Sequence, residues 1–349
     1  MTTQRLTAGV LATLVAALVL AAVLAGGGSA KPTATFKAAL ISDVGHFNDK
    51  GFNQSQLAGL NLAKKKLKVQ TLAIQSNNTS DYIPNLTSAI RQNSNLVISA
   101  GFLMAADLKT VAAQFPNTHF AITDDTVSSA FGDFKGADVS NIEGLTYATQ
   151  QNSYLIGCMA AMVTKAEKGK GQVIGVVGGI KIPPVDIFLA GYEAGAKKCV
   201  PGTTVLKGYS QDFVKQDLCK TVAENEIQGG AHVVFAVAGL CGLGALSAAH
   251  DHGIWGVGVD RDQSFLGTYI LTSAVKRVDV GVYNAIRDAK AGKFKGGSNA
   301  VFNLKNKGVA LGKISPKLKG KLRKQVLAKI AILRKQIISG KIKVPTSVG

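Results

Sequence analysis

The order in which short apolar segments and helical patterns follow one another constrains this chain's fold more than any other sequence feature. Strand-like runs at residues 37–42, 96–100 and 120–123 alternate with helical patterns at 53–67 and 105–115. This alternation is typical of a parallel sheet covered by helices, because each parallel connection needs a crossover. The first part of the chain is therefore predicted to form an α/β unit.

The same alternation restarts near Tyr147 with a helical pattern that extends to Thr164. Further strands are expected at 173–177, 204–207, 233–238 and 255–259, with helices at 186–198, 217–228 and 243–252 between them. Two α/β units of comparable size predict two lobes with a cleft between them.

The last third of the chain is too short for a third core. It holds strand patterns at 269–274 and 300–304 and a helical pattern at 279–291. We therefore expect the chain to return to each lobe in turn. The first lobe is assigned residues 36–145 plus about 264–292, and the second 146–263 plus about 293–312.

The amino-terminal residues have the pattern of an export signal. Arg5 precedes an apolar run at 6–24, and Gly28-Ser29-Ala30 provides small residues for cleavage. We interpret residues 1–30 as a signal peptide. An uncleaved anchor is the alternative, because the run approaches the ~18–20 residues that span a bilayer. The following chain is expected to be extracytoplasmic, in the periplasm or at the outer face of the plasma membrane, and no cysteine directly follows the run to carry a lipid.

Positive charge is concentrated at the carboxyl end. The chain has 40 Lys and Arg against 21 Asp and Glu, and residues 313–349 hold eleven basic residues and no acidic one. An apolar stripe predicts a basic amphipathic helix in 313–349, packed on the second lobe or, alternatively, attracted to anionic lipid. Its members are Leu318, Leu322, Val326, Ile330, Leu333 and Ile337. The tail has no aromatic residue to stack on a base, so nucleic acid is not an expected partner.

The four cysteines of an exported chain suggest disulfides. Cys219 lies in the first turn of a predicted helix, and Cys241 lies just past the next strand. Helix and strand run antiparallel in such a unit, so a Cys219–Cys241 bridge is predicted. Two buried free thiols are the alternative, and the state of Cys158 and Cys199 stays open.

No catalytic or cofactor motif stands out. His250-Asp251-His252 has no third ligand at a recognisable spacing, and no Gly-Lys-Ser/Thr phosphate loop occurs. Glycine loops at 175–179 and 239–244 follow strands but lack the full dinucleotide fingerprint. We expect no cofactor, no metal and no enzymatic activity.

A set of acidic and aromatic residues lies where the predicted strands end. Ligands of open α/β sheets bind outside the carboxyl ends of the strands, so this set predicts a binding cleft. Phenyl rings suit a flat ligand, and carboxylates with an ammonium suit its hydroxyl groups. The residues are Asp43, Asn48, Phe52, Asn53, Phe102, Asp124, Phe188, Gly239, Asp260 and Lys276.

Several segments in order along the chain carry a family resemblance. They include 42–45 (SDVG), 48–54 (NDKGFNQ), 81–86 (DYIPNL), 121–124 (AITD), 256–260 (GVGVD) and 271–279 (LTSAVKRVD). With these segments the chain resembles the basic membrane protein family, extracytoplasmic purine-nucleoside-binding proteins of ABC transporters. The resemblance implies an α/β fold of the periplasmic-binding-protein type I class, with two Rossmann-like lobes, a hinge and a central ligand cleft.

The resemblance also implies roles for the cleft residues. Phe52 and Phe188 would stack on the base, and Asp124 with Asn53 or Asn48 would read its polar edge. Asp260 and Lys276 would hold the ribose, Gly239 would contribute backbone, and Asp43 would lie at the floor of the first lobe. The implied partners are a purine nucleoside and a membrane permease, with the protein expected to be monomeric. A sensory receptor and an exported nucleoside hydrolase are the rival functions.

Overall fold

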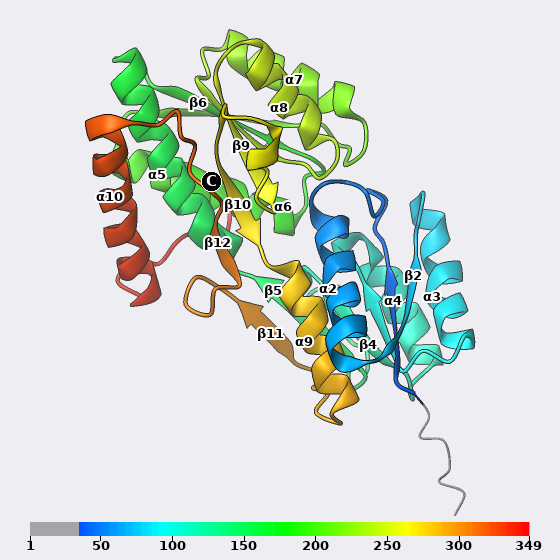
Figure 1. Ribbon diagram of the computed structural model, residues 1–349. Coiled ribbons are helices and arrows are strands. Elements are labelled where there is room, and N and C mark those ends of the chain that lie inside the picture. Colours follow the sequence, from blue (N-terminus) through cyan, green and yellow to red (C-terminus); the bar gives the residue numbers. More distant parts are fainter. Residues whose placement is uncertain (1–34, 170, 349) are drawn as a thin grey trace, which may run out of the picture. The chain divides into compact units, whose positions relative to one another are not determined.

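The computed structural model describes residues 35–169 and 171–348, so the expected signal peptide lies outside the described residues. The described chain forms two six-stranded sheets, each covered by helices (Figure 1). No helix in these two ranges is both long enough and apolar enough to cross a membrane.

The first sheet is entirely parallel. Its strands are arranged in the order β11 (Asn299–Phe302), β5 (Ile142–Tyr147), β4 (His119–Thr123), β3 (Leu96–Ser99), β1 (Lys37–Ile41) and β2 (Gln70–Ile74). The helices of this lobe are α2 (Phe52–Leu67), α3 (Tyr82–Arg91), α4 (Ala105–Gln114) and α9 (Val278–Lys290), with short turns η1 (Thr79–Asp81) and η2 (Phe102–Met104).

The second sheet repeats this plan with one antiparallel edge strand. Its order is β12 (Val309–Leu311), β10 (Ile270–Lys276), β9 (Trp255–Asp260), β8 (Val233–Val237), β6 (Val173–Gly178) and β7 (Thr204–Tyr209). Its helices are α5 (Thr149–Lys168), α6 (Pro183–Cys199), α7 (Gln216–Gln228), α8 (Gly242–Asp251) and α10 (Gly320–Ile338), with a short turn η3 (Ser264–Leu266).

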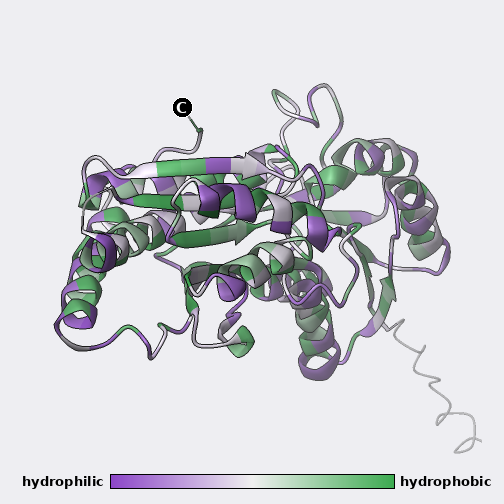
Figure 2. Cartoon of the chain, turned by 90° about the horizontal axis from the view of Figure 1, so that it is seen from above, coloured by the Kyte–Doolittle hydropathy of each residue, from purple (hydrophilic) through white to green (hydrophobic). Residues whose placement is uncertain are grey.

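The central strands are apolar because helices cover both faces of each sheet. Every residue of β3 and β8 is buried, whereas the edge strand β2 consists of exposed and half-buried residues. Figure 2 shows apolar strands between helices whose outer sides are polar. The weak pattern of β2 explains why the sequence analysis did not predict it, and α3, β5 and β12 were likewise not predicted.

The expected return of the chain to the two lobes needs a correction. β10 was assigned to the first lobe, but it pairs with β9 in the second sheet. β11 was assigned to the second lobe, but it pairs with β5 in the first sheet. Of the three elements β10, α9 and β11, only α9 lies in the lobe that was expected for its segment. The apolar pattern of a strand reports that it is buried and does not say beside which strand, so the exchange was invisible locally.

The chain consequently crosses between the lobes three times. The chain passes from β5 in the first lobe to α5 in the second, and from β10 in the second lobe to α9 in the first. It then passes from β11 in the first lobe to β12 in the second. Three neighbouring connections form a hinge of the kind that permits two lobes to close on a ligand.

Close packing of α5 on α6 forms the base of the second lobe. A side chain at Gly157 would meet the carbonyl oxygen of Tyr192 at 1.9 Å, and one at Gly195 would meet that of Tyr154 at 1.9 Å. Only glycine permits this approach, and it places the amino end of α6 at the cleft.

Two disulfides stabilise the second lobe. Cys219 and Cys241 are bonded as expected, with Cα atoms 5.6 Å apart, because the first turn of α7 lies beside the carboxyl end of β8. The second bridge, Cys158–Cys199, joins α5 to the last residue of α6. The sequence alone does not pair these two cysteines.

The basic carboxyl-terminal segment contains the expected amphipathic helix, α10, over part of its length. Val326, Ile330, Leu333 and Ile337 are buried and pack in the main core. The helix therefore packs on the second lobe, which is the first of the two arrangements expected from the sequence.

Candidate functional site

A cleft between the two lobes collects the ends of strands from both sheets. It contains about 620 Å³ of space free of atoms, part of which is open to solvent. The lining residues are Asp43, Gly45, Asp49, Phe52, Asn53, Gly101, Phe102, Leu103, Asp124, Ile182, Pro184, Val185, Phe188, Phe213, Val237, Ala238, Gly239, Val259, Asp260 and Lys276.

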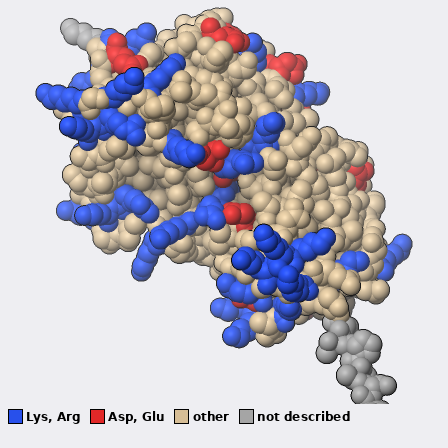
Figure 3. Space-filling view, viewed as in Figure 1, with Lys and Arg blue, Asp and Glu red and all other residues tan. Residues whose placement is uncertain are grey.

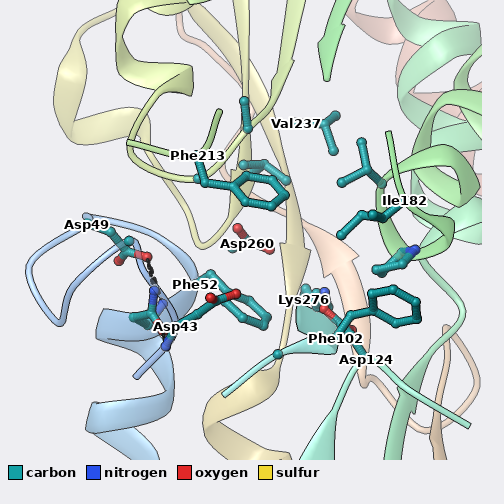
Figure 4. Close-up of a pocket in the computed structure, with 18 of the residues that line it drawn as sticks. Asp43, Asp49, Phe52, Phe102, Asp124, Ile182, Phe213, Val237, Asp260 and Lys276 are labelled. Carbon is teal, nitrogen blue, oxygen red and sulfur yellow. Dashed lines mark hydrogen bonds and ion pairs between the residues drawn. The ribbon is translucent and has the colours of Figure 1, made fainter. Parts of the chain in front are cut away.

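An ion pair in the cleft joins the lobes. Lys276 at the end of β10 donates from Nζ to Asp124, just past β4, and both side chains are almost fully buried. Figure 4 shows the two groups side by side on the floor of the cleft. Because Lys276 belongs to the second sheet and Asp124 to the first, this pair couples the lobes at the hinge.

Two aspartates take equivalent places in the two lobes. Asp124 follows β4 with φ of 71°, and Asp260 ends β9 with φ of 63°. This left-handed conformation is uncommon for residues other than glycine, and it turns the chain sharply at the strand end. Such strain is often concentrated at ligand sites.

Burial shifts the protonation of both groups. Loss of hydration raises the pKa of Asp260 to about 7, although the Lys276 ammonium opposes the shift and the carboxylates of Asp49 and Asp124 add to it. Burial also raises the pKa of Asp124, with Lys276 acting in the opposite direction. Asp260 is therefore a carboxyl group that changes charge near neutral pH.

A separate network holds Asp43, which lies just past the carboxyl end of β1. The Tyr82 hydroxyl and the Val44 backbone N–H both donate to its Oδ1. Burial raises the pKa of Asp43 to about 6 despite these bonds. A side chain at Gly101 would lie 2.8 Å from the Asp43 Oδ2, so Gly101 is needed to leave that oxygen room.

Asn53 acts as a structural link in the same network. Its Oδ1 accepts from the Asp43 backbone N–H at 3.0 Å, and its Nδ2 donates to Asp49 at 3.3 Å. Asp49 also accepts the backbone N–H groups of Gly51, Asn53 and Gln54 and so caps α2. Asn53 thereby positions the amino end of α2, which carries Phe52.

Aromatic rings from both lobes line the cleft. The Lys276 Nζ lies 4.7 Å from the ring centroid of Phe52 and 5.6 Å from that of Phe188, so rings on α2 and α6 approach the same point. Phe213 lies on the opposite side of the cleft from Phe52 and Phe102 (Figure 4). The cleft therefore offers flat apolar surfaces beside charged groups.

Glycines determine where Phe213 lies. A side chain at Gly179 would lie 2.4 Å from the Phe213 ring, and the Cys241 N–H donates to the Phe213 carbonyl at 2.9 Å. Gly239 has φ of 55°, and a side chain there would lie 3.4 Å from the Phe213 carbonyl oxygen, which is an ordinary contact distance. Gly179 thus gives the Phe213 ring the room that it needs, whereas at Gly239 it is the left-handed backbone that favours glycine.

Nine of the ten expected ligand residues line this cleft, and Asn48 does not. Asn48 is exposed, because the next residue, Asp49, turns inward to cap α2. The sequence analysis missed Phe213 and Asp49. Asp49 follows the Asx pattern of a helix start and could have been found, whereas Phe213 lies in a loop without a periodic signal.

Polar contacts across the outer rim join the loops of the two lobes. The Arg261 Nη1 donates to the Gln54 Oε1 at 2.8 Å, and the Gln263 Nε2 donates to the Lys50 carbonyl at 3.2 Å. These bonds connect the loop after β9 to the start of α2. They link the two lobes directly.

Two hinged α/β lobes with a cleft at their strand ends define a type I periplasmic binding protein. The fold is similar to an ABC transporter solute-binding protein from Aeropyrum pernix, with a TM-score of 0.78, 25% identity, and coverage of 90% of this chain and 94% of that one. Residues 36–347 match the family model of the PnrA-like ABC transporter substrate-binding protein, and the chain belongs to that family.

Named relatives agree with this assignment. The chain is 33% identical to the ABC transporter nucleoside-binding protein BmpA of Lactococcus lactis subsp. cremoris, with coverage of 95% of this chain and 97% of that protein. It is 32% identical to basic membrane protein A1 of Borrelia garinii subsp. bavariensis, with 77% of each chain covered. The protein is therefore a solute-binding component of an ABC transporter.

Proposed function

We propose that this protein is extracytoplasmic, captures a purine nucleoside in the interlobe cleft as a monomer, and delivers it to the permease of an ABC importer. The aromatic rings at the cleft carry this proposal. Phe52 and Phe188 come from different lobes and both approach the Lys276 ammonium, so closure can bring them onto a flat base. The nucleoside-binding relative in Lactococcus lactis supports the same ligand class.

The polar groups suit the sugar. Asp260, Asp124 and Lys276 form one cluster of acceptors and donors, which matches the vicinal hydroxyls of a ribose. Asp43 lies in a separate network with its Oδ2 beside Gly101, and we assign it to the polar edge of the base. Asn53 takes a positioning role because both ends of its amide are already bonded.

The charge of the cleft favours a nucleoside over a nucleotide. Its lining includes the carboxyl groups of Asp43, Asp49, Asp124 and Asp260 but a single ammonium, Lys276. A phosphate would meet several carboxylates without a free cation, and such like-charge contacts cost several kcal/mol. We expect nucleoside monophosphates to bind about 100-fold more weakly than the nucleosides.

The test is calorimetric titration of residues 36–349, which contain both sheets, after unfolding and refolding to remove carried-over ligand. Inosine, guanosine, adenosine, uridine, ribose and inosine monophosphate are compared. Tight one-to-one binding of purine nucleosides with ribose silent is expected. Silence from every nucleoside in refolded protein, or release of free base during the titration, overturns the proposal.

Substitution of the rings tests the site. Phe52→Ala and Phe188→Ala should each weaken binding about tenfold or more, since stacking on a base contributes roughly 1–3 kcal/mol. Phe188 also packs against Phe235, with ring centroids 6.2 Å apart, so the half-buried Phe52 gives the cleaner result. Phe131→Ala is the matched control, because Phe131 is 60% exposed and does not line the cleft.

A further inference from the structure

The carboxyl-terminal segment has a large positive charge that nothing in the described structure neutralises. Residues 313–348 contain eleven Lys and Arg residues and no Asp or Glu, and nine of the eleven are exposed. Among the ion pairs within residues 35–169 and 171–348, none includes a residue of this segment. The segment is therefore a cationic surface without an internal partner.

The charges in the first turn of α10 are not placed to stabilise the helix, whereas Lys335 in the last turn does complement the helix dipole. The first turn of α10 has no acidic residue and holds Lys321 and Arg323, where the helix dipole disfavours positive charge. Without acidic residues, the helix also has no i,i+4 ion pair. A sequence selected for helix stability alone would have acids at these positions.

The exposed face of α10 combines lysines with apolar side chains. Lys321, Lys324 and Lys335 lie on the side opposite the buried stripe, at helical spacing. Ile332 is 54% exposed and Ile338 is 38% exposed, so they rank among the exposed large hydrophobic residues of the described chain. A face of lysines and isoleucines matches a surface that is anionic outside and apolar beneath.

This face is separate from the ligand site. No residue of α10 lines the interlobe cleft. In Figure 3, Lys and Arg atoms gather along the edge of the second lobe that α10 occupies in Figure 1. A partner on this face leaves the cleft free to bind ligand.

We propose that the outer face of α10 docks the protein onto an anionic phospholipid bilayer. The lysines bind the headgroup phosphates, and Ile332 and Ile338 enter the boundary between headgroups and acyl chains. Charge complementarity identifies this occupant, since the face offers several donors to a surface of closely spaced phosphates. The contact holds the binding protein near the membrane and is independent of the amino-terminal segment.

Vesicle co-sedimentation of residues 36–349 tests the proposal. Vesicles of phosphatidylcholine mixed with phosphatidylglycerol are compared with pure phosphatidylcholine, at low and at high salt. The test variant is Lys321→Gln/Lys324→Gln/Lys335→Gln. The control variant, Lys64→Gln/Lys65→Gln/Lys66→Gln, removes the same charge from exposed lysines at the end of α2. Nucleoside titration and thermal unfolding verify that both variants fold.

The wild type should bind the mixed vesicles and lose binding at high salt. The α10 variant should bind at least tenfold more weakly, and the control variant should bind as the wild type does. Ile332→Gln should weaken binding to the mixed vesicles at low salt, although it removes no charge. Equal losses of vesicle binding in the two lysine variants would show that binding depends only on net charge, and would overturn the proposal. Absence of wild-type binding would overturn it in favour of an acidic protein partner.

Discussion

Ligand affinity should depend on pH through the protonation of Asp260. This residue is 7% exposed, and its pKa is about 7, because burial disfavours the carboxylate more strongly than Lys276 favours it. The proposed site needs the carboxylate form, which accepts hydrogen bonds from the ribose hydroxyls. Ligand binding should therefore release a proton, and affinity should rise as the pH is raised.

The size of the effect follows from the ionised fraction. With a pKa of about 7, roughly one Asp260 in ten is ionised at about pH 6 and roughly nine in ten at about pH 8. Apparent affinity is proportional to the fraction of protein in the competent state. The association constant should consequently rise about tenfold over this range. Asp43, with a pKa of about 6, adds a smaller rise at the acidic end.

The assay is calorimetric titration with inosine at constant ionic strength in steps from about pH 6 to about pH 8. Repeating the titration near pH 7 in buffers of different ionisation enthalpy measures the released proton directly. Asp260→Asn keeps the shape but removes the titration, so its affinity should be low and its pH profile nearly flat. Asp43→Asn is the matched control and should retain most of the rise.

Two results would refute this reasoning. A wild-type affinity that is constant or falls between about pH 6 and about pH 8 would show that the ligand does not require the Asp260 carboxylate. A rise of equal size in Asp260→Asn would assign the titration to another group.

Three further predictions concern stability and closure. Burial raises the pKa of Glu226 from 4.5 to about 8, so folding favours the protonated carboxyl group. The free energy of unfolding should therefore fall by up to about 5 kcal/mol as the pH rises from about 4.5 to about 8. Urea unfolding of Glu226→Gln should lack this loss, and equal pH slopes in both proteins would contradict the assignment. Arg261→Ala removes a charged hydrogen bond between the lobes and should weaken nucleoside binding about three- to tenfold in the same titration; unchanged affinity would show that this bond does not favour closure. Cys219→Ala/Cys241→Ala opens a loop with a sequence separation of 22 and should lower the free energy of unfolding by about 3 kcal/mol, whereas an unchanged denaturant midpoint would contradict it.

Local sequence signals predicted much of the site because they follow from topology. Asp124, Gly239 and Asp260 were expected in the cleft because they come directly after buried strands, and the carboxyl ends of parallel strands meet at one edge. The Cys219–Cys241 bridge followed from the same geometry. These inferences need only the order of elements along the chain.

Side-chain direction within loops was harder to predict. Asn48 and Asp49 are adjacent, yet the first is exposed and the second is buried as the cap of α2. Phe213 lines the cleft, and Gly179 leaves the space that its ring occupies. Such placements depend on contacts with distant residues, which no periodic pattern records.

The sequence by itself determined the two α/β units, the cleft at their strand ends and the amphipathic character of α10, because burial imposes periodic apolar patterns. Only the tertiary structure decided that β10 belongs to the second sheet and β11 to the first. It also decided that Lys276 pairs with Asp124 across the hinge. Backbone hydrogen bonds between strands are alike for every neighbour, so the choice of neighbour depends on packing over the whole chain.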